Sequence, residues 1–328
     1  MNVFLAGATG ALGQRLVPLL LAGGHEVTAM TRSPQKAPHL RAAGATPVVA
    51  DALDRDAVMR AVTTAAPDVV IHQLTALSGM TDLRRFDRAF AQTNRLRTEG
   101  TDLLLEAARA AGARRFVAQS YAGWPYERTG GAVKDEEAPL DSSPARSMRE
   151  TLAAIRHVEE AVTGTRDLEG VVLRYGGFYG PGSGLAEGGE QAELLRRRRF
   201  PVIGDGGGVW SFIHLDDAAS ATVAALENGA PGIYNVVDDD PAPVREWLPH
   251  LAAAVGAPPP RHIPRWLARL AAGEAPVVLM TEIRGASNAK ARRQLGWSPR
   301  WASWRQGFVD GLGSPSHGAA QLGSPGVR

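Results

Sequence analysis

The first thirteen residues constrain the fold of this chain more than any other stretch. An apolar run from Met1 to Ala6 leads into a loop with glycines at positions 7, 10 and 13, and a helical pattern runs from Ala11 to Ala22. Glycines at this spacing let the backbone turn sharply, approach a pyrophosphate closely and pack the helix tightly on the strand. The helix N-terminus offers free N–H groups to phosphate oxygens. The strand, loop and helix together predict a dinucleotide site.

Strand and helix patterns continue to alternate through the first half of the chain. This alternation is typical of a parallel sheet covered by helices on both faces. We therefore predict an α/β fold: a doubly wound, Rossmann-like parallel sheet with a second, smaller α+β substrate domain. After the first strand, the expected strands are residues 25–30, 46–50, 68–73, 115–119 and 170–175, and the expected helices are 34–43, 54–65, 82–111 and 147–162, with Ser33 and Asp54 as N-caps.

The composition shifts toward Gly and Pro after Tyr175. We assign residues 1–175 to dinucleotide binding and 176–311 mainly to substrate binding. Residues 312–328 are rich in Gly, Ser and Pro and are expected to form a disordered tail. In the second half we expect a helix over 186–198, short strands at 202–203 and 209–213, and helices over 265–272 and 303–310.

The bulk composition excludes several classes of function. The hydrophobic content is 44%, the net charge is only +2 and the chain has no cysteine. Disulfides, thiol nucleophiles and cysteine metal sites are excluded, and we predict no metal site. The basic residues are dispersed, so we expect no nucleic-acid partner; the run Arg196 to Arg199 suits a solvated helix end better than a phosphate site. No apolar run reaches membrane-spanning length and no signal peptide is expected, so we predict a cytoplasmic protein without membrane contact.

The end of the second strand indicates which dinucleotide binds. An acidic residue there would accept hydrogen bonds from ribose hydroxyls, but the chain has Thr31 and Arg32. Arg32 could pair with a 2′-phosphate, which favours NADP, with NAD as the alternative. A solvated arginine is the other interpretation. Asp51, after the third strand, could accept from the adenine amino group or simply flank a helix.

Several further blocks resemble the extended short-chain dehydrogenases/reductases, the NAD-dependent epimerase/dehydratase family. The resemblance covers residues 1–311, in order. Besides the glycine loop it rests on blocks at 67–72, 100–108, 115–120, 173–182, 212–219, 234–236 and 295–299. It implies a small-molecule substrate and a homodimer. By this resemblance and the loop, the expected cofactor-binding residues are Gly7, Thr9, Gly10, Ala11, Leu12, Gly13, Arg32, Asp51, Ala52, Leu74, Thr75, Arg174 and Tyr175.

The catalytic pattern that the resemblance implies is not found where it is expected. Family members that transfer hydride use a Ser or Thr, a Tyr and a Lys four residues after the Tyr, for general acid–base catalysis. The helix over 147–160 contains neither Tyr nor Lys. Counting back from Glu159 or Glu160 puts the Tyr position at Thr151 or Leu152 and the Lys position at Ile155 or Arg156, whereas counting from Pro144 puts the Tyr position at Met148. No alignment restores the pair.

The end of the fifth strand supplies other candidates. Ser120, Tyr121 and Tyr126 offer a hydroxyl and two phenols, and we predict them as catalytic residues. Tyr121 occupies the Ser/Thr position by strict counting. The alternative is that both tyrosines are wall residues with buried rings. Weaker candidates are His72, Asn94, Arg156 and His157, and we interpret His214 and Asp216 as structural rather than as a metal pair.

These observations predict an NAD(P)-dependent oxidoreductase, or an epimerase or dehydratase, that acts on a small organic substrate with atypical catalytic residues. Two alternatives remain open. One is a non-catalytic NADP(H)-binding sensor or interaction protein, which the missing Tyr and Lys would suit. The other is a nucleotide-sugar epimerase or dehydratase, although Trp210 and Ser211 stand where such enzymes commonly have an arginine.

Overall fold

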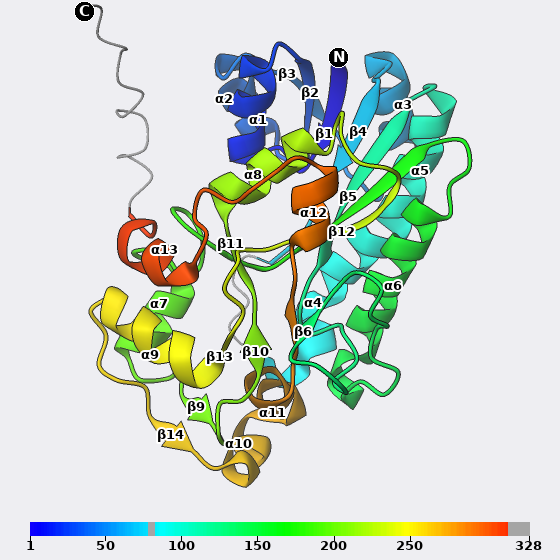
Figure 1. Ribbon diagram of the computed structural model, residues 1–328. Helices are drawn as coiled ribbons and strands as arrows, with labels where there is room; N and C mark the ends of the chain where they lie inside the picture. Colours follow the sequence, from blue (N-terminus) through cyan, green and yellow to red (C-terminus); the bar gives the residue numbers. More distant parts are fainter. Residues whose placement is uncertain (78–82, 314–328) are drawn as a thin grey trace, which may run out of the picture.

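A seven-stranded parallel sheet forms the centre of the computed structural model, which describes residues 1–77 and 83–313 (Figure 1). The strand order is β12-β7-β5-β4-β1-β2-β3. The chain first winds from β1 to one edge and then returns to β4 and winds to the other, which confirms the predicted doubly wound fold. The strands are β1 (Asn2–Ala6), β2 (Glu26–Thr31), β3 (Thr46–Val49), β4 (Val69–His72), β5 (Arg115–Tyr121), β7 (Glu169–Tyr175) and β12 (Gly232–Val236).

Alternating side chains of the strands build two hydrophobic layers. In β1, Val3 and Leu5 pack toward one face, and Phe4 and Ala6 toward the other. Each of the larger side chains gains about 1.5–3 kcal/mol from burial. Helices cover both faces: α1 (Gly13–Ala22), α2 (Ala37–Ala42) and α8 (Leu215–Ala224) lie on the first, and α3 (Arg55–Ala65), α5 (Thr101–Ala110) and α6 (Arg149–Thr163) on the second.

One strand of the sheet comes from the second half of the chain. β12 pairs in parallel with β7, from Gly232 opposite Val171 to Val236 opposite Tyr175. The helix before it, α8, packs on α1 (Figure 1). Residues 215–236 therefore lie with the first domain, although they follow the predicted boundary at residue 175.

The smaller part of the molecule has its own aromatic core. Trp247, Trp304, Phe212 and Phe308 are all at most 2% exposed, and their rings meet edge to face or tilted. Its elements are β8 (Gly177–Tyr179), α7 (Glu190–Arg196), β9 (Val202–Ile203), β10 (Val209–Trp210), β11 (Phe212–His214), β13 (Ala242–Pro243), α9 (Val244–Ala254), β14 (His262–Ile263), α10 (Arg265–Ala272), α11 (Glu274–Thr281) and α13 (Trp304–Asp310). A further helix, α12 (Ala289–Gln294), lies beside β12.

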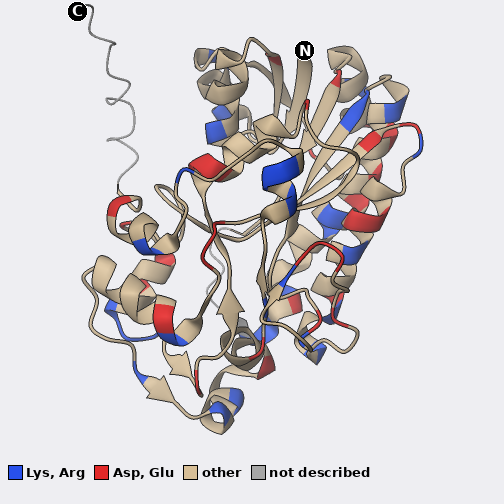
Figure 2. Ribbon diagram, in the orientation of Figure 1, with Lys and Arg blue, Asp and Glu red and all other residues tan. Residues whose placement is uncertain are grey.

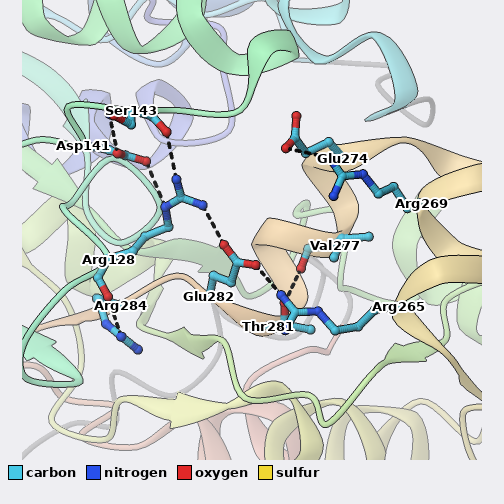
Figure 3. A network of polar contacts seen from close by, with 10 residues as sticks. All are labelled: Arg128, Asp141, Ser143, Arg265, Arg269, Glu274, Val277, Thr281, Glu282 and Arg284. Carbon is cyan, nitrogen blue, oxygen red and sulfur yellow. Dashed lines mark hydrogen bonds and ion pairs between the residues drawn. The ribbon is translucent and has the colours of Figure 1, made fainter.

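The loop between β5 and α6 ties the two parts together. Its short strand β6 (Val133–Lys134) pairs with β15 (Gly285–Ala286). Near this pairing, the guanidinium of Arg128 contacts Asp141 Oδ2 at 3.1 Å and Glu282 Oε2 at 2.6 Å, and Glu282 also pairs with Arg265 (Figure 3). Because Arg128 belongs to the loop and Glu282 follows α11, this network holds the loop against the smaller domain.

The helix predicted over 82–111 is confirmed from residue 83 onward, but it is not regular; Asp82 lies outside the described residues. A 3₁₀ turn, η2 (Leu83–Arg85), precedes α4 (Phe86–Arg95), and the π-helical turn η3 (Leu96–Gly100) joins α4 to α5. A π-helical turn inserts one extra residue into a helix. The insertion rotates the side chains that follow, and it often marks a functional position.

Three local expectations were wrong. Ser33 does not cap a helix, because its hydroxyl bonds the Gln35 side chain; a 3₁₀ turn, η1 (Pro34–Lys36), follows and α2 begins at Ala37. Gly188, with φ +73°, interrupts the helix expected over 186–198, so α7 begins only at Glu190. The strand expected over 209–213 is two strands, because β10 pairs with β13 and β11 with β8. By contrast, Asp54 caps α3 as predicted, accepting from Ala57 N at 3.0 Å.

Lys and Arg positions alternate with Asp and Glu positions along the ribbons of both parts (Figure 2). This distribution agrees with the dispersed basic residues of the sequence. Across residues 1–77 and 83–313, no helix combines the length and the apolar character that crossing a membrane requires. Of the predicted tail, only Leu312 and Gly313 fall within the described residues.

Candidate active site

The glycine loop lies at the end of β1, where the strand order reverses between β1 and β4. Gly7 has φ +100°, and a Cβ there would stand 2.7 Å from Gln73 O. A Cβ on Gly13 would stand 2.1 Å from Gly7 O, so only glycine lets α1 pack this closely. A Cβ on Gly10 would meet only Gly7 O, at 3.4 Å, which leaves its other side open to a ligand. The crevice at such a reversal is where open α/β sheets bind dinucleotides, and the loop fits one.

The other loop residues complete a shallow surface at the start of α1. Thr9 is partly exposed and Ala11 fully so, whereas Leu12 is buried and anchors the loop in the core. The carbonyl of Thr9 is bound by the Gln14 side chain at 3.2 Å. Backbone N–H groups in the first turn of a helix have no partner within it, so they can face an anion.

The ends of β2 and β3 carry the residues expected to choose between NAD and NADP. Arg32 follows β2 directly and is exposed, and within the described residues no carboxylate pairs with it. Asp51 is also exposed, but its Oδ1 already accepts from Leu53 N at 3.0 Å. Its neighbour Ala52 is buried. Arg32 is therefore available to a phosphate, whereas one of the two carboxylate oxygens of Asp51 is already hydrogen-bonded within its own turn.

The end of β4 carries a buried amide that lacks one partner. Gln73 donates to the Tyr175 hydroxyl at 3.2 Å, but its Oε1 has no partner among the described residues. Leu74 and Thr75 follow and are partly exposed. Tyr175 is 1% exposed, and its hydroxyl also bonds Thr222 at 2.7 Å. Of these residues, Leu74 and Thr75 are the ones that could touch a cofactor, and Tyr175 supports Gln73 from behind.

Ser120 and Arg174 meet on one buried carboxylate. Arg174 donates to both oxygens of Glu159, from Nε at 2.7 Å and from Nη2 at 2.6 Å, and Ser120 Oγ donates to Oε1 at 2.7 Å. Arg174 and Glu159 are only 3% and 5% exposed. Because the Ser120 hydrogen is committed to Glu159, Ser120 can accept a hydrogen bond but is a poor proton donor. Arg174 was predicted to bind cofactor; here its guanidinium lies in this ion pair.

Tyr121 ends β5 with its side chain partly exposed. Its ring packs against the apolar cluster that includes Phe86, Trp124 and Ile155. Burial raises the pKa of the Tyr121 hydroxyl to about 12, although the charge of Arg97 lowers it. The phenol is therefore protonated at neutral pH, and of the three predicted catalytic residues it is the best placed to donate a proton.

Tyr126 is 1% exposed and belongs to the scaffold of the loop. Its hydroxyl donates to Asn235 Oδ1 and accepts from Arg174 Nη1 at 3.3 Å. Burial raises its pKa to about 12. On the far side, the backbone N–H of Asn235 donates to Glu136 at 2.8 Å. Tyr126 thus joins the loop to β7 and β12, with both its ring and its hydroxyl buried.

The face of α6 toward β5 carries Thr151, Ile155 and Glu159, four residues apart. Thr151 and Ile155 are fully buried. Thr151 Oγ1 donates to Asp87 at 2.7 Å and accepts from Asn94 at 3.1 Å, and Ile155 lies in the apolar cluster. Glu159 is buried whereas Glu160 is exposed. Of the alignments considered above, the one counted from Glu159 places its Tyr and Lys positions at Thr151 and Ile155, both on this buried face.

The sequence pattern of the NAD-dependent epimerase/dehydratase family matches residues 3–236. The chain belongs to this family. It is accordingly an NAD(P)-binding oxidoreductase of the epimerase/dehydratase family that acts on a small organic substrate.

Among curated relatives, the 3-diazoavenalumate denitrifying reductase of a Streptomyces species is 49% identical over 94% of this chain and 99% of its own. A 2-alkyl-3-oxoalkanoate reductase of Stenotrophomonas maltophilia is 31% identical over 79% of this chain and 77% of its own. The Thermus thermophilus UDP-glucose 4-epimerase, solved in complex with NAD, is 26% identical over 95% and 98% of the two chains, with a TM-score of 0.72. A human epimerase family protein, solved with NADPH, shares the fold. It is 21% identical over 95% of this chain and 99% of its own, with a TM-score of 0.73.

Arg97 was not among the residues predicted from the sequence. It is a buried arginine beside this site. It lies in the π-helical turn η3, its side chain is 5% exposed, and its Nη1 has no hydrogen-bond partner among the described residues. Burial lowers its pKa to about 10, so it stays charged at neutral pH. Asn94, one turn earlier, also has a buried Oδ1 without a partner in the described part of the chain.

The weaker candidates lie in structural roles. His72 Nε2 contacts Leu96 O and Thr101 Oγ1 at 3.2 and 3.1 Å, and burial lowers its pKa to about 4. His157 pairs with Asp102 on the outer side of α6, and Arg156 is exposed there. His214 caps α8 by accepting from Asp216 N, in agreement with the structural interpretation. In the arginine run, Arg196 pairs with Glu193, so this end of α7 is partly neutralised.

Proposed function

We propose that this protein is an NADPH-dependent reductase that replaces the diazo group of an aromatic compound with hydrogen. The observation that carries the proposal is the α6 face, where Thr151 and Ile155 provide no acid. Reduction of a carbonyl needs a proton on oxygen as well as a hydride. A diazonium group is already electron-poor and can accept hydride without that proton.

The reaction balances without any acid. A bound reduced nicotinamide supplies one hydride, which carries two electrons. The terminal nitrogen of Ar–N≡N⁺ forms a bond to this hydride and becomes the neutral diazene Ar–N=N–H. Water takes the N–H proton as the carbon–nitrogen bond breaks and N₂ leaves. The electron pair of that bond stays on the ring carbon, which takes up a proton from water, so no net proton is consumed. The net change is Ar–N₂⁺ plus NADPH to Ar–H, N₂ and NADP⁺.

Two further observations support this proposal. The 49% identical relative, matched over nearly its whole length, is named a denitrifying reductase of a diazo compound. The cluster against which Tyr121 packs is aromatic: Phe86 and Phe90 stack with ring centres 4.4 Å apart, and Trp124 meets Phe86 edge to face. Phe86 and Trp124 are buried, so Phe90 and Tyr121 are the partly exposed rings of this group. An aromatic wall suits an aryl substrate. The chain's own contribution is to orient the ring and exclude water around the diazo group.

The experiment follows the hydrogen. Purified protein is mixed with an aryl diazonium salt and NADPH deuterated at the nicotinamide C4, beside a mixture without protein that measures the uncatalysed reaction. We expect protein-dependent NADPH oxidation, release of N₂ and a slower rate with the deuterated cofactor, whereas the new ring hydrogen comes from water because the N–D of the diazene exchanges with the solvent. Protein-dependent oxidation of NADPH by ketones but not by diazonium salts would overturn the proposal.

Carbonyl reduction is the second candidate, and Tyr121 is the observation that favours it. A phenol with its pKa raised to about 12 by burial keeps its proton and can give it to a carbonyl oxygen. The 31% identical relative is named a reductase of an oxoalkanoate. Tyr121→Phe separates the candidates, because it should lower ketone reduction by about 100-fold or more and diazo reduction far less. Equal losses for both substrates would show that the ring packing was disturbed instead.

We also propose that NADP(H) is preferred over NAD(H), because Arg32 stands exposed at the end of β2 without a carboxylate partner in the described structure. Arg32→Ala should raise the Kd for NADPH about 10- to 100-fold, the value of a charge-assisted hydrogen bond, and leave that for NADH unchanged. The matched control is Arg60→Ala on α3, also exposed, which should change neither. Similar Kd values for the two cofactors in the unaltered protein would contradict this preference.

A further inference from the structure

Arg97 is a buried cation at the carboxyl end of the sheet, and one of its N–H donor groups lacks an acceptor among the described residues. Its side chain is 5% exposed and its Nη1 has no acceptor among residues 1–77 and 83–313. The π-helical turn that carries it lies against α6, and the turn is anchored by the contact of His72 with Leu96 O. The carboxylate of Glu159 raises the pKa of Arg97, and Tyr121, neutral at pH 7, is a second titratable neighbour. Arg97 therefore lies beside the site described above and is not used by it.

The neighbours of Arg97 do not balance its charge. Glu159 is the buried carboxylate nearby, and Arg174 already pairs with both of its oxygens while Ser120 bonds one of them. Tyr121 and His72 are neutral at pH 7, because burial raises the pKa of the phenol to about 12 and lowers that of the imidazole to about 4. Among residues 1–77 and 83–313, two buried arginines thus face this one buried carboxylate, which leaves one positive charge without a counter-charge.

This surplus charge sets a condition on the substrate. An unpaired buried cation is costly, and an anion that enters the site is stabilised by it. A simple aryl diazonium ion would add a second positive charge next to Arg97 and would be repelled. A substrate that also carries a negative oxygen is neutral overall and can place that oxygen toward the guanidinium.

We propose that Arg97 recognises an anionic oxygen of the substrate, so that the protein prefers diazo compounds whose positive charge is balanced by a phenolate or a carboxylate on the same molecule. This inference rests on the diazo reduction proposed above. Hydride addition at the terminal nitrogen turns such a neutral zwitterion into an anion. In a hydroxyaryl diazo compound the new charge rests on the conjugated phenolate oxygen. Arg97 then stabilises a charge that grows along the reaction, which lowers the barrier.

Three substrates and two variants test this assignment. The substrates are benzenediazonium ions that carry a hydroxyl, a carboxyl or a methoxy group at the same ring position, of which only the first two are anionic on oxygen near neutral pH. The variants are Arg97→Met, which removes the charge but keeps an apolar side chain of similar length, and Arg97→Lys, which retains it. The matched control is Arg95→Met, because Arg95 lies two residues away but is exposed and paired with Glu99.

We expect the unaltered protein to favour an anionic substrate over the methoxy compound by about 10- to 100-fold in kcat/KM. Arg97→Met should bring this ratio close to one, with the methoxy compound reduced as fast as before or faster. Arg97→Lys should recover part of the preference, and Arg95→Met should keep all of it. Loss of the preference for the hydroxyl compound alone identifies a phenolate, and loss for the carboxyl compound alone identifies a carboxylate.

The outcomes also separate this inference from the function on which it rests. If the unaltered protein reduces none of the three diazonium ions, the proposed function is wrong. If it reduces them and the ratio is the same in Arg97→Met, diazo reduction stands and the role of Arg97 is overturned. NADPH binding and urea unfolding of Arg97→Met establish that it is folded; replacing a buried unpaired charge by an apolar group is expected to leave it at least as stable.

Discussion

The glycine loop and the Glu159 cluster lie at the same edge of one sheet but hold their shape by different means. The loop, residues 7–13, depends on the absence of side chains: its contacts are between backbone atoms of Gly7, Gly13 and Gln73. The Glu159 cluster, which consists of Ser120, Glu159 and Arg174, depends on buried charge and on three side chains brought from β5, α6 and β7. The first can bind the same dinucleotide whatever the reaction is. The charges of the second act on any group that binds beside it.

The largest effect should come from the Glu159 cluster. Glu159→Gln would leave Arg174 buried without its counter-charge, beside Arg97, whose Nη1 has no acceptor within the described part of the chain. Breaking a buried ion pair by removing one partner costs about 3–5 kcal/mol, so we expect the free energy of unfolding to fall by that amount in urea titrations. Glu160→Gln, the exposed neighbour on the same helix, should change it by about 0.5 kcal/mol or less. Similar values for both variants would show that the cluster does not stabilise the fold.

The second effect is a pH dependence at His72, which lies between the two regions at the end of β4. Burial lowers its pKa from 6.5 to about 4, so the unfolded chain takes up a proton at a higher pH than the folded protein does. This stabilisation is present above pH 6.5 and is lost as the pH falls toward 4. The shift corresponds to about 3 kcal/mol.

The measurement compares the unaltered protein with His72→Gln, whose side chain does not titrate. The difference in free energy of unfolding between the two should shrink by about 3 kcal/mol from pH 7 to pH 4. His157→Gln is the control, because this histidine is partly exposed on the outer side of α6. A difference for His72→Gln that is the same at both pH values would contradict the buried, neutral imidazole.

The third and smallest effect on stability belongs to the glycine loop. A Cβ on Gly13 would stand 2.1 Å from Gly7 O, so Gly13→Ala must push the start of α1 away from the strand. We expect a loss of about 2 kcal/mol in stability, which is typical of overpacking, together with weakened NADPH binding in a fluorescence titration. Gly23→Ala at the other end of α1, where φ is −75° and a Cβ would stand no closer than 3.3 Å to any neighbour, should leave NADPH binding unchanged and change stability by about 1 kcal/mol or less. Normal NADPH affinity in Gly13→Ala would mean that the loop does not hold the cofactor.

The sequence predicted the loop because its signal is local. Gly7, Gly10 and Gly13 lie within one strand, turn and helix, and the spacing alone fixes the geometry. The same holds for β4, β5 and β7, whose apolar runs mark buried parallel strands, and for Asp54, whose cap depends on the next three residues. The helix break at Gly188 was missed because the composition around it is otherwise helical, and its positive φ cannot be seen in the sequence.

The Glu159 cluster could not be predicted in this way. Ser120 lies 39 residues from Glu159 in the chain, and Tyr126 lies 109 residues from Asn235. The local sequence pattern does not indicate that these side chains meet. Glu159 was used only to align the helix with the family's catalytic pattern. Arg97 escaped notice for a related reason: the π-helical turn that buries it cannot be read from its neighbours. The catalytic roles of Ser120, Tyr121 and Tyr126 stay predictions, with Tyr121 the best placed of the three.

The late arrival of β12 has a consequence for how the chain is made. Until residue 236 has left the ribosome, β7 is an edge strand with unpaired backbone groups, and the face of α1 that α8 will cover is bare. Exposed strand edges invite pairing with other chains. During synthesis, residues 176–214 of the smaller domain and then α8 must emerge before β12 can complete the first sheet. A nascent chain stalled between β7 and β12 is therefore the species most prone to aggregate, and cutting the gene after the codon for Tyr175 would produce that species permanently.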